Sequence, residues 1–368
     1  MRTKGRVART VLPAVLIAVA SAFSPAVAAK QAKHAKQTKQ AYTPAPAVTT
    51  APRLHEAARS FEAALLLSGP TRLAALDNLD RALPKIAEDA GSERAAALAL
   101  AGAVRYARAD FPGAEDSYRK TVKESEKSPF ADDAAFAAIR SLEAQGLDGE
   151  AAREWAKWEK DWPKSPLIPE ARLARAWNAM RRGDVTEAQK TLALLTTSAP
   201  WFTADPRVTL ARATALALDQ KPAAALEALG PTHKGAAATY LYALCQSASG
   251  SLLRAAAAFQ EVADRYPGTP LRDPALLGKA NAFLAAKDYR SAASEFTRIS
   301  GLINDRGLRA EAELRAAGSL FLTGAPDTAL TLLRDVVARY RDTDVAARAQ
   351  FLVGEVLVAQ GKPADAIV

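Results

Sequence analysis

From Arg53 onward, the hydrophobic residues of this chain recur at intervals of three and four positions. One stretch shows the pattern clearly, with apolar residues at Leu252, Ala255, Phe259, Val262 and Tyr266. This spacing puts all five side chains on one face of an α-helix. No run alternates between apolar and polar residues with a period of two, as a half-buried strand would. The pattern predicts an all-α protein with helices of about 12–18 residues.

Short segments rich in glycine, aspartate and proline separate the predicted helices, as at Arg182-Gly183-Asp184 and Thr323-Gly324. Glycine adopts the left-handed conformation that ends many helices. A following Asp or Thr can accept a hydrogen bond from the first turn of the next helix. Because these connections are short, we expect consecutive helices to be antiparallel neighbours.

An alanine returns every 37 residues, with one interval of 30 residues between Ala225 and Ala255. Four residues after each alanine, where the chain extends that far, stands an aromatic residue or a leucine. Twelve residues before it stands a small residue in every repeat except the one with Ile139. The small residues predict close crossings between paired helices, into which the larger side chain packs. The alanines are Ala114, Ala151, Ala188, Ala225, Ala255, Ala292, Ala329 and Ala366.

A fixed period of this size is typical of repeat proteins, whose units stack on their neighbours. The 30-residue interval predicts a shortened second helix or a tight loop after Leu229, with His233 exposed in that turn. Ala366 falls in the first turns of a second helix, so the last pair is predicted to be incomplete. The predicted pairs span residues 53–88, 92–126, 130–161, 167–197, 205–230, 235–266, 270–300 and 306–341, and a ninth begins near 344.

These repeats resemble the tetratricopeptide repeat. The small residue, glycine, alanine, aromatic residue, apolar residue and proline of that family's pattern are matched by Ala243, Gly250, Ala255, Phe259, Val262 and Pro267. The resemblance extends from about residue 70 to residue 368. It implies a right-handed α-solenoid of antiparallel helix pairs over residues 53–368, whose groove binds protein or peptide partners.

The chain also departs from the family's pattern. Its period of 37 residues exceeds the usual 34, and the family's first conserved tryptophan is absent. Ile139 occupies a position that is otherwise small, which predicts looser packing in that repeat. The longer repeat resembles those of bacterial envelope proteins, such as the outer-membrane assembly lipoproteins and the periplasmic partner of the Tol-Pal system. That resemblance implies a scaffold in the cell envelope.

All five tryptophans lie between residues 155 and 201. Trp155, Trp158 and Trp162 occupy the register of Phe259, Val262 and Tyr266, so we expect them in the core. Trp177 instead falls on the face of a first helix that lines the groove in tetratricopeptide proteins. Aromatic residues and arginine dominate binding hot spots, so this face is predicted to bind a peptide. The predicted groove contacts are Tyr106, Arg140, Glu143, Trp177, Arg181, Tyr240 and Asn281.

The formal charge of +9 comes almost entirely from the N-terminus. Residues 1–52 carry eight basic residues and no acidic one, which leaves 41 basic against 40 acidic residues and a net charge of +1 in the rest. A neutral body argues against nucleic-acid binding. Residues 30–52, rich in Lys, Gln, Pro and Thr, are predicted to be a disordered linker. It could act as a spacer or as a weak tether to anionic lipid or envelope polymer.

Residues 1–29 have the layout of a secretory signal peptide, with a cationic start, an apolar run from Val11 to Ala22, and a cleavage site after Ala28 or Ala29. No cysteine follows the leader, which argues against a lipid-anchored form. We therefore expect an exported protein that is periplasmic or secreted. Cys245 is the single cysteine, so no intrachain disulfide can form, and its apolar helix predicts a buried thiol.

Nothing in the sequence favours catalysis. His34, His55 and His233 have no metal-like spacing, and no nucleophile elbow, phosphate-binding loop or zinc-protease motif is present. We expect no cofactor, no metal and no enzyme activity of the chain itself. The alternative is the substrate-recruiting helical arm of a longer cell-wall enzyme, which the incomplete last repeat motivates.

Overall fold

The computed structural model describes residues 52–124, 131–231 and 234–366. Within these ranges the chain forms α-helices and short 3-10 turns and no strand. It divides into two compact units. We call the described residues up to Ala211 the N-unit and those from Arg212 onward the C-unit. The predicted signal peptide and linker lie outside the described residues, as does His233.

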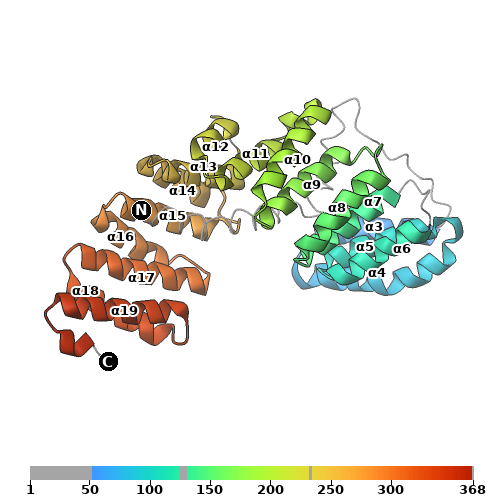
Figure 1. The fold of residues 1–368 in the computed structure, drawn as a ribbon. Helices are drawn as coiled ribbons and strands as arrows, with labels where there is room; N and C mark the ends of the chain where they lie inside the picture. Colours follow the sequence, from blue (N-terminus) through green and yellow to red (C-terminus); the bar gives the residue numbers. More distant parts are fainter. Residues whose placement is uncertain (1–51, 125–130, 232–233, 367–368) are drawn as a thin grey trace. The chain divides into compact units, whose positions relative to one another are not determined.

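The N-unit is a stack of helix pairs (Figure 1). In each pair the second helix packs against the first, and the next first helix packs against it in turn. The pairs are α3 (Pro52–Leu66) with α4 (Gly69–Asp89), α5 (Arg94–Ala107) with α6 (Phe111–Glu124), α7 (Ala131–Ala144) with α8 (Asp148–Asp161), and α9 (Ile168–Arg181) with α10 (Val185–Ser198). The 3-10 turns η2 (Gly91–Glu93) and η3 (Pro200–Ala204) connect pairs, and α11 (Pro206–Leu218) spans the boundary between the units.

The C-unit repeats the same arrangement (Figure 1). Its helices are α12 (Pro222–Leu229), α13 (Ala236–Ala248), α14 (Leu252–Arg265), α15 (Arg272–Ala285), α16 (Tyr289–Ser300), α17 (Arg306–Leu322), α18 (Pro326–Arg339) and α19 (Asp344–Ala359), followed by the 3-10 turn η4 (Pro363–Ala366). The helices begin and end within a few residues of the ranges that the repeat predicts. The second helix before the 30-residue interval is short, as predicted, since α12 has eight residues.

The recurring alanines are the crossing points of the helix pairs. From Ala114 to Ala329 every one of them is fully buried, and the larger residue four positions later is buried as well. The small residues allow close approach. A Cβ added at Gly102 would lie 2.6 Å from the Tyr118 ring, and one at Gly278 would lie 2.7 Å from the Phe259 ring. The aromatic side chain therefore occupies the space that a missing side chain leaves on a neighbouring first helix.

Two local features set the turns within pairs. Asp184 and Asp288 each accept a hydrogen bond from a backbone N–H of the following helix, at Glu187 and Ser291, which confirms the predicted capping. The left-handed position before the cap is glycine in some repeats. It is a non-glycine residue in others, such as Lys287 with φ of 61°. The left-handed turn is thus retained in repeats that have no glycine at this position.

Ile139 is buried on α7, where the other repeats carry a smaller residue or glycine. Beside it lies a hollow of about 230 Å³ between α6 and α8, with Val122 and Trp158 in its walls. The looser packing predicted for this repeat stays a prediction, since Ile139 and the adjacent Trp158 are both buried.

Candidate functional site

Within each unit, the first helices of successive pairs lie side by side. Contacts link α3 with α5 in the N-unit, and α13 with α15, α15 with α17, and α17 with α19 in the C-unit. We call the surface formed by these first helices the A face of its unit. All seven predicted contact residues come from first helices, in α5, α7, α9, α13 and α15. Their burial and contacts decide which of them a partner can reach.

Four of the seven predicted residues meet on the A face of the N-unit. Glu143 of α7 lies at the centre, with only 4% of its side chain exposed. It forms an ion pair with Arg140 one turn earlier on the same helix. Its Oε1 atom also lies 2.7 Å from Nη2 of Arg181 on α9 and accepts a hydrogen bond of 3.1 Å from Nε1 of Trp155 on α8. One carboxylate therefore joins three consecutive helices.

Tyr106 completes this cluster from α5. Burial is the main cause that raises the pKa of its phenol, while the charges of Arg140 and Arg181 lower it and that of Glu143 raises it. Its ring packs edge-on against Phe111 at 5.2 Å. Tyr106 thus lies within electrostatic reach of the other three predicted residues.

The charges of this cluster are balanced internally. Arg181 also donates from Nε to Oδ1 of Asp148 at 2.8 Å, so two arginines face two carboxylates. Asn178 donates to the same Asp148 oxygen at 3.1 Å. A partly buried network of this kind orders its side chains before any partner arrives. It offers arginine and tyrosine edges at the surface, and it leaves no net charge to attract a strongly charged ligand.

Two predicted contact residues are buried. Trp177 of α9 and Tyr240 of α13 each expose only 3% of their surface. The Tyr240 ring packs edge-on against Phe259 at 5.5 Å, and burial raises the pKa of its phenol. Both positions point toward the A face in the repeat register, but neighbouring helices cover them. In this structure both side chains are buried beneath the A face and expose little surface to a partner.

The core assignment of Trp155, Trp158 and Trp162 is supported. Trp155 and Trp158 are fully buried, and Trp162 is half-buried against Trp158 with ring centroids 5.8 Å apart. Nε1 of Trp158 donates to the backbone carbonyl of Asp132 at 3.0 Å. These rings therefore hold α7 and α8 together and form no ligand cage.

The seventh predicted residue, Asn281, belongs to a polar row on the A face of the C-unit. Its side-chain oxygen accepts a hydrogen bond of 2.8 Å from Arg315 of α17. Arg315 Nε lies 2.6 Å from Glu311 Oε1, and Glu311 also pairs with Arg348 of α19. Burial would raise the pKa of Glu311, but hydrogen bonds and charges from Arg348 and Arg315 hold it below the usual value. The row links α15, α17 and α19.

Three exposed apolar residues share this face and were missed by the sequence reasoning. Phe351 and Val358 of α19 follow Arg348 by three and ten residues, which places them on the same side of the helix. Leu322 follows Glu311 by eleven residues on α17 and shares its side in the same way. Their exposed fractions are 66% for Phe351, 56% for Val358 and 52% for Leu322. Val358 and Leu322 occupy positions equivalent to the predicted contacts Glu143 and Arg181. The register does not mark Phe351 as exposed, because its equivalents Leu277 and Leu314 pack against the first helix that follows them and are buried.

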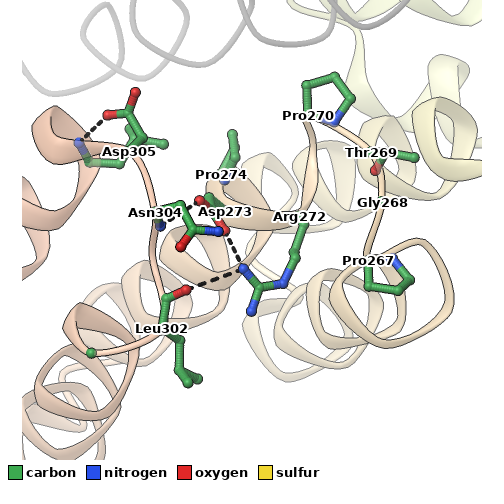
Figure 2. A pocket seen from close by; sticks show the side chains of 12 residues that line it. Pro267, Gly268, Thr269, Pro270, Arg272, Asp273, Pro274, Leu302, Asn304 and Asp305 are labelled. Carbon is green, nitrogen blue, oxygen red and sulfur yellow. Dashed lines mark hydrogen bonds and ion pairs between the residues drawn. The ribbon is translucent and has the colours of Figure 1, made fainter. Parts of the chain in front are cut away.

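A shallow hollow of about 760 Å³ lies elsewhere in the C-unit, between residues 267–274 and 301–308 (Figure 2). Asp273 sits in its wall, where Oδ2 accepts from the backbone N–H of Asn304 at 3.0 Å and Oδ1 lies 2.7 Å from Nη1 of Arg272. Arg272 also donates to the carbonyl of Leu302 at 3.2 Å. These bonds tie one inter-repeat loop to the next, so we interpret the hollow as a joint between repeats.

Among the described residues no group of three or more His, Cys, Asp or Glu side chains is placed to hold a metal ion. No described helix combines the length and the apolar character that crossing a bilayer requires. Cys245 is buried, and burial raises the pKa of its thiol to about 12. These observations describe the surfaces of the two units and identify no chemical centre.

Comparison with known proteins identifies the repeat. Residues 230–368 match the family model of the tetratricopeptide repeat-like domain. A search of curated proteins finds no match. Among solved structures, a tetratricopeptide repeat protein from Parabacteroides merdae is 13% identical with a TM-score of 0.51, over 69% of this chain and 96% of that one.

A second solved structure is a Signal Transduction ATPase with Numerous Domains (STAND) protein with a tetratricopeptide repeat sensor, from Pyrococcus horikoshii. It is 15% identical with a TM-score of 0.57, and the match covers 87% of this chain. This chain spans about half of that protein, with 52% of it covered. At these identities the likeness concerns the fold. The described chain therefore consists of antiparallel helix pairs packed in a tetratricopeptide-like repeat, a fold that generally serves as a scaffold for protein–protein interaction.

Proposed function

We propose that the protein is an exported, non-catalytic scaffold that binds a protein partner on the A face of its C-unit. The observation that carries this proposal is the set of exposed side chains of Phe351, Val358 and Leu322 beside the ordered polar row of Glu311 and Arg348. Exposed apolar side chains next to fixed charges are the usual make-up of a binding surface.

The spacing of this surface suggests the form of the ligand. Phe351 and Val358 are seven residues apart on one helix, so their side chains emerge about 10 Å apart along its axis. Apolar side chains two turns apart on a partner helix match this distance. An extended peptide fits less well, because its side chains three residues apart, about 10 Å, point to opposite faces. Arg348 and Glu311 flank the apolar positions and favour a partner with paired charges there.

Two further features support rigid display of these side chains. Arg348 is already held by Glu311 on the neighbouring helix. α19 itself packs on α17 and α18. A surface that is ordered before binding loses less conformational entropy when the partner arrives.

The proposed location rests on the N-terminal sequence. A cationic start, a short apolar run and an Ala-x-Ala site support export by a cleaved signal peptide. The lack of a cysteine after the leader supports a form without a lipid anchor. Fractionation of the producing bacterium and N-terminal sequencing of the mature chain test this part. A first residue at Ala29 or Lys30 is expected, whereas an intact N-terminus in the cytoplasm would contradict it.

Site-specific photocrosslinking tests the binding surface. In one full-length chain, a photoreactive phenylalanine analogue replaces Phe351. In the control chain the same analogue replaces Arg334, an exposed residue of α18, which is the second helix of the last complete pair. The proposal predicts a discrete crosslinked protein from position 351 that is absent from position 334. Identical products from both positions, or none from 351, would count against it.

A further inference from the structure

Phe351 differs from the residues that occupy its position in the preceding repeats of the C-unit. The equivalent residues are Leu277 on α15 and Leu314 on α17, and both are buried. Leu277 belongs to a buried cluster that includes Ala312 of α17, and Leu314 belongs to one that includes Ala349 of α19. At this position the repeat therefore packs on a further first helix, whereas Phe351 is 66% exposed.

The exposed residues around Phe351 form one narrow stripe along α19. A helix turns by about 100° per residue, so the five residues of the stripe lie within an arc of about 80°. Two of them are apolar, three are charged, and all five are exposed. We call them the α19 stripe, and they are Asp344, Arg348, Phe351, Glu355 and Val358.

The order of charges along the α19 stripe is self-complementary. Arg348 precedes Phe351 by three residues and Glu355 follows it by four, so they lie about 4.5 Å and about 6 Å from it along the helix axis. In an antiparallel pair of α19 helices centred on Phe351, Arg348 of one copy is therefore within about 1.5 Å of the level of Glu355 of the other.

The symmetry of such a pair brings these opposite charges together twice. Arg348 and Glu355 both turn to the same side of Phe351, and a two-fold axis through the centre of the pair keeps them on that side in both copies. A parallel pair in the same register would instead place Arg348 beside Arg348. The charges thus favour the antiparallel arrangement.

We propose that the α19 stripe binds the α19 stripe of a second copy of this chain, antiparallel, around a two-fold axis at Phe351. This inference rests on the proposed function and names the partner of the same surface. The second copy supplies a helix with apolar side chains two turns apart, at Phe351 and Val358. A guanidinium has five N–H donors, so Arg348 can keep its pair with Glu311 and also bind Glu355 of the second copy.

Sedimentation velocity of the full mature chain over a range of concentrations tests the pairing. We expect monomer and dimer and no larger species, because two-fold pairing covers the same surface on both copies. Phe351→Ser is expected to weaken dimerisation about 100-fold, since the residue occurs twice in the interface and each burial contributes roughly tenfold. Leu253→Ser changes an exposed leucine of α14 and should dimerise like the unmodified chain.

A charge variant tests the register of the pair. Glu355→Arg places like charges at Arg348 of the second copy, and we expect dimerisation to weaken roughly tenfold, because an exposed pair contributes little but is lost twice. Asp335→Arg makes the same change of charge at an exposed position of α18 and should have no effect. All four replaced side chains are exposed, so circular dichroism should show unchanged helix content in every variant.

The outcomes separate this inference from the proposed function. A chain that stays monomeric, or dimerisation that Phe351→Ser or Glu355→Arg leaves unchanged, would overturn the antiparallel pairing. If such a chain still crosslinks a different protein from position 351, the proposed function stands with another partner. If it crosslinks none, both proposals fail.

Discussion

The buried carboxylate of Glu143 offers the sharpest test of the N-unit. Glu143→Ala removes the group that pairs with Arg140 and Arg181 and that accepts a hydrogen bond from Trp155. Breaking a buried ion pair by deleting one partner costs about 3–5 kcal/mol, because the remaining charge is left without compensation. Arg181 retains Asp148 at 2.8 Å. We therefore expect the lower end of that range, about 3 kcal/mol.

A conservative change separates charge from shape. Glu143→Gln keeps an oxygen that can accept from Trp155 and fills nearly the same volume, but it lacks the negative charge. We expect it to cost about 1.5 kcal/mol, in the range of a hydrogen bond to a charged group. Glu88→Ala is the control, since Glu88 is 65% exposed in its pair with Lys85 and exposed ion pairs contribute little.

Urea unfolding followed by tryptophan fluorescence is suited to this measurement. All five tryptophans lie between residues 155 and 201, inside the N-unit, so the signal reports the unfolding of that unit. Repeat proteins can unfold in parts, and the fluorescence transition is therefore assigned to the N-unit alone. The description of a buried, shared carboxylate is refuted if Glu143→Ala and Glu88→Ala shift the transition equally.

Three further predictions concern packing and titration. Gly278→Ala would place a Cβ 2.7 Å from the Phe259 ring and is expected to destabilise the C-unit by about 1–3 kcal/mol. Gly318→Ala, which meets no atom within 4 Å, should stabilise it by up to about 1 kcal/mol; thermal melts distinguish the two. The thiol of Cys245, whose pKa burial raises to about 12, should resist a disulfide reagent at neutral pH until urea unfolds the chain. Burial and a neighbouring carboxylate raise the pKa of Asp133 from 3.8 to about 6, so the folded state holds this proton more tightly, and stability falls as pH rises between these values. Asp133→Asn should therefore increase the free energy of unfolding at neutral pH by about 1 kcal/mol, after allowance for partial exposure, and the gain should vanish in acid.

The helix pairs could be predicted because their determinants repeat along the sequence. Ala151 and Trp155 are four residues apart and share a helix face, so their spacing alone places both at a crossing. The same argument predicted the shortened helix that ends at Leu229. Such local spacing carries no information about non-local neighbours.

The A faces were harder to predict for that reason. The repeat register put Trp177 and Tyr240 on the binding side, but it does not say how closely the next first helix approaches, and both side chains are buried. Likewise, Arg140, Glu143 and Arg181 were expected to face a partner, whereas the structure shows that they bind one another. Their contact with a partner remains a prediction.

The affinity of the crosslinked partner for C-unit variants tests the central claim most directly. Isothermal titration calorimetry would compare the unmodified chain with Phe351→Ser plus Val358→Ser, and with Leu253→Ser as the exposed control on α14. We predict at least a roughly tenfold weaker affinity for the double variant, since each apolar contact contributes more than about 1 kcal/mol, and no change for the control. Equal affinity of all three chains would contradict the proposal that the A face of the C-unit binds the partner.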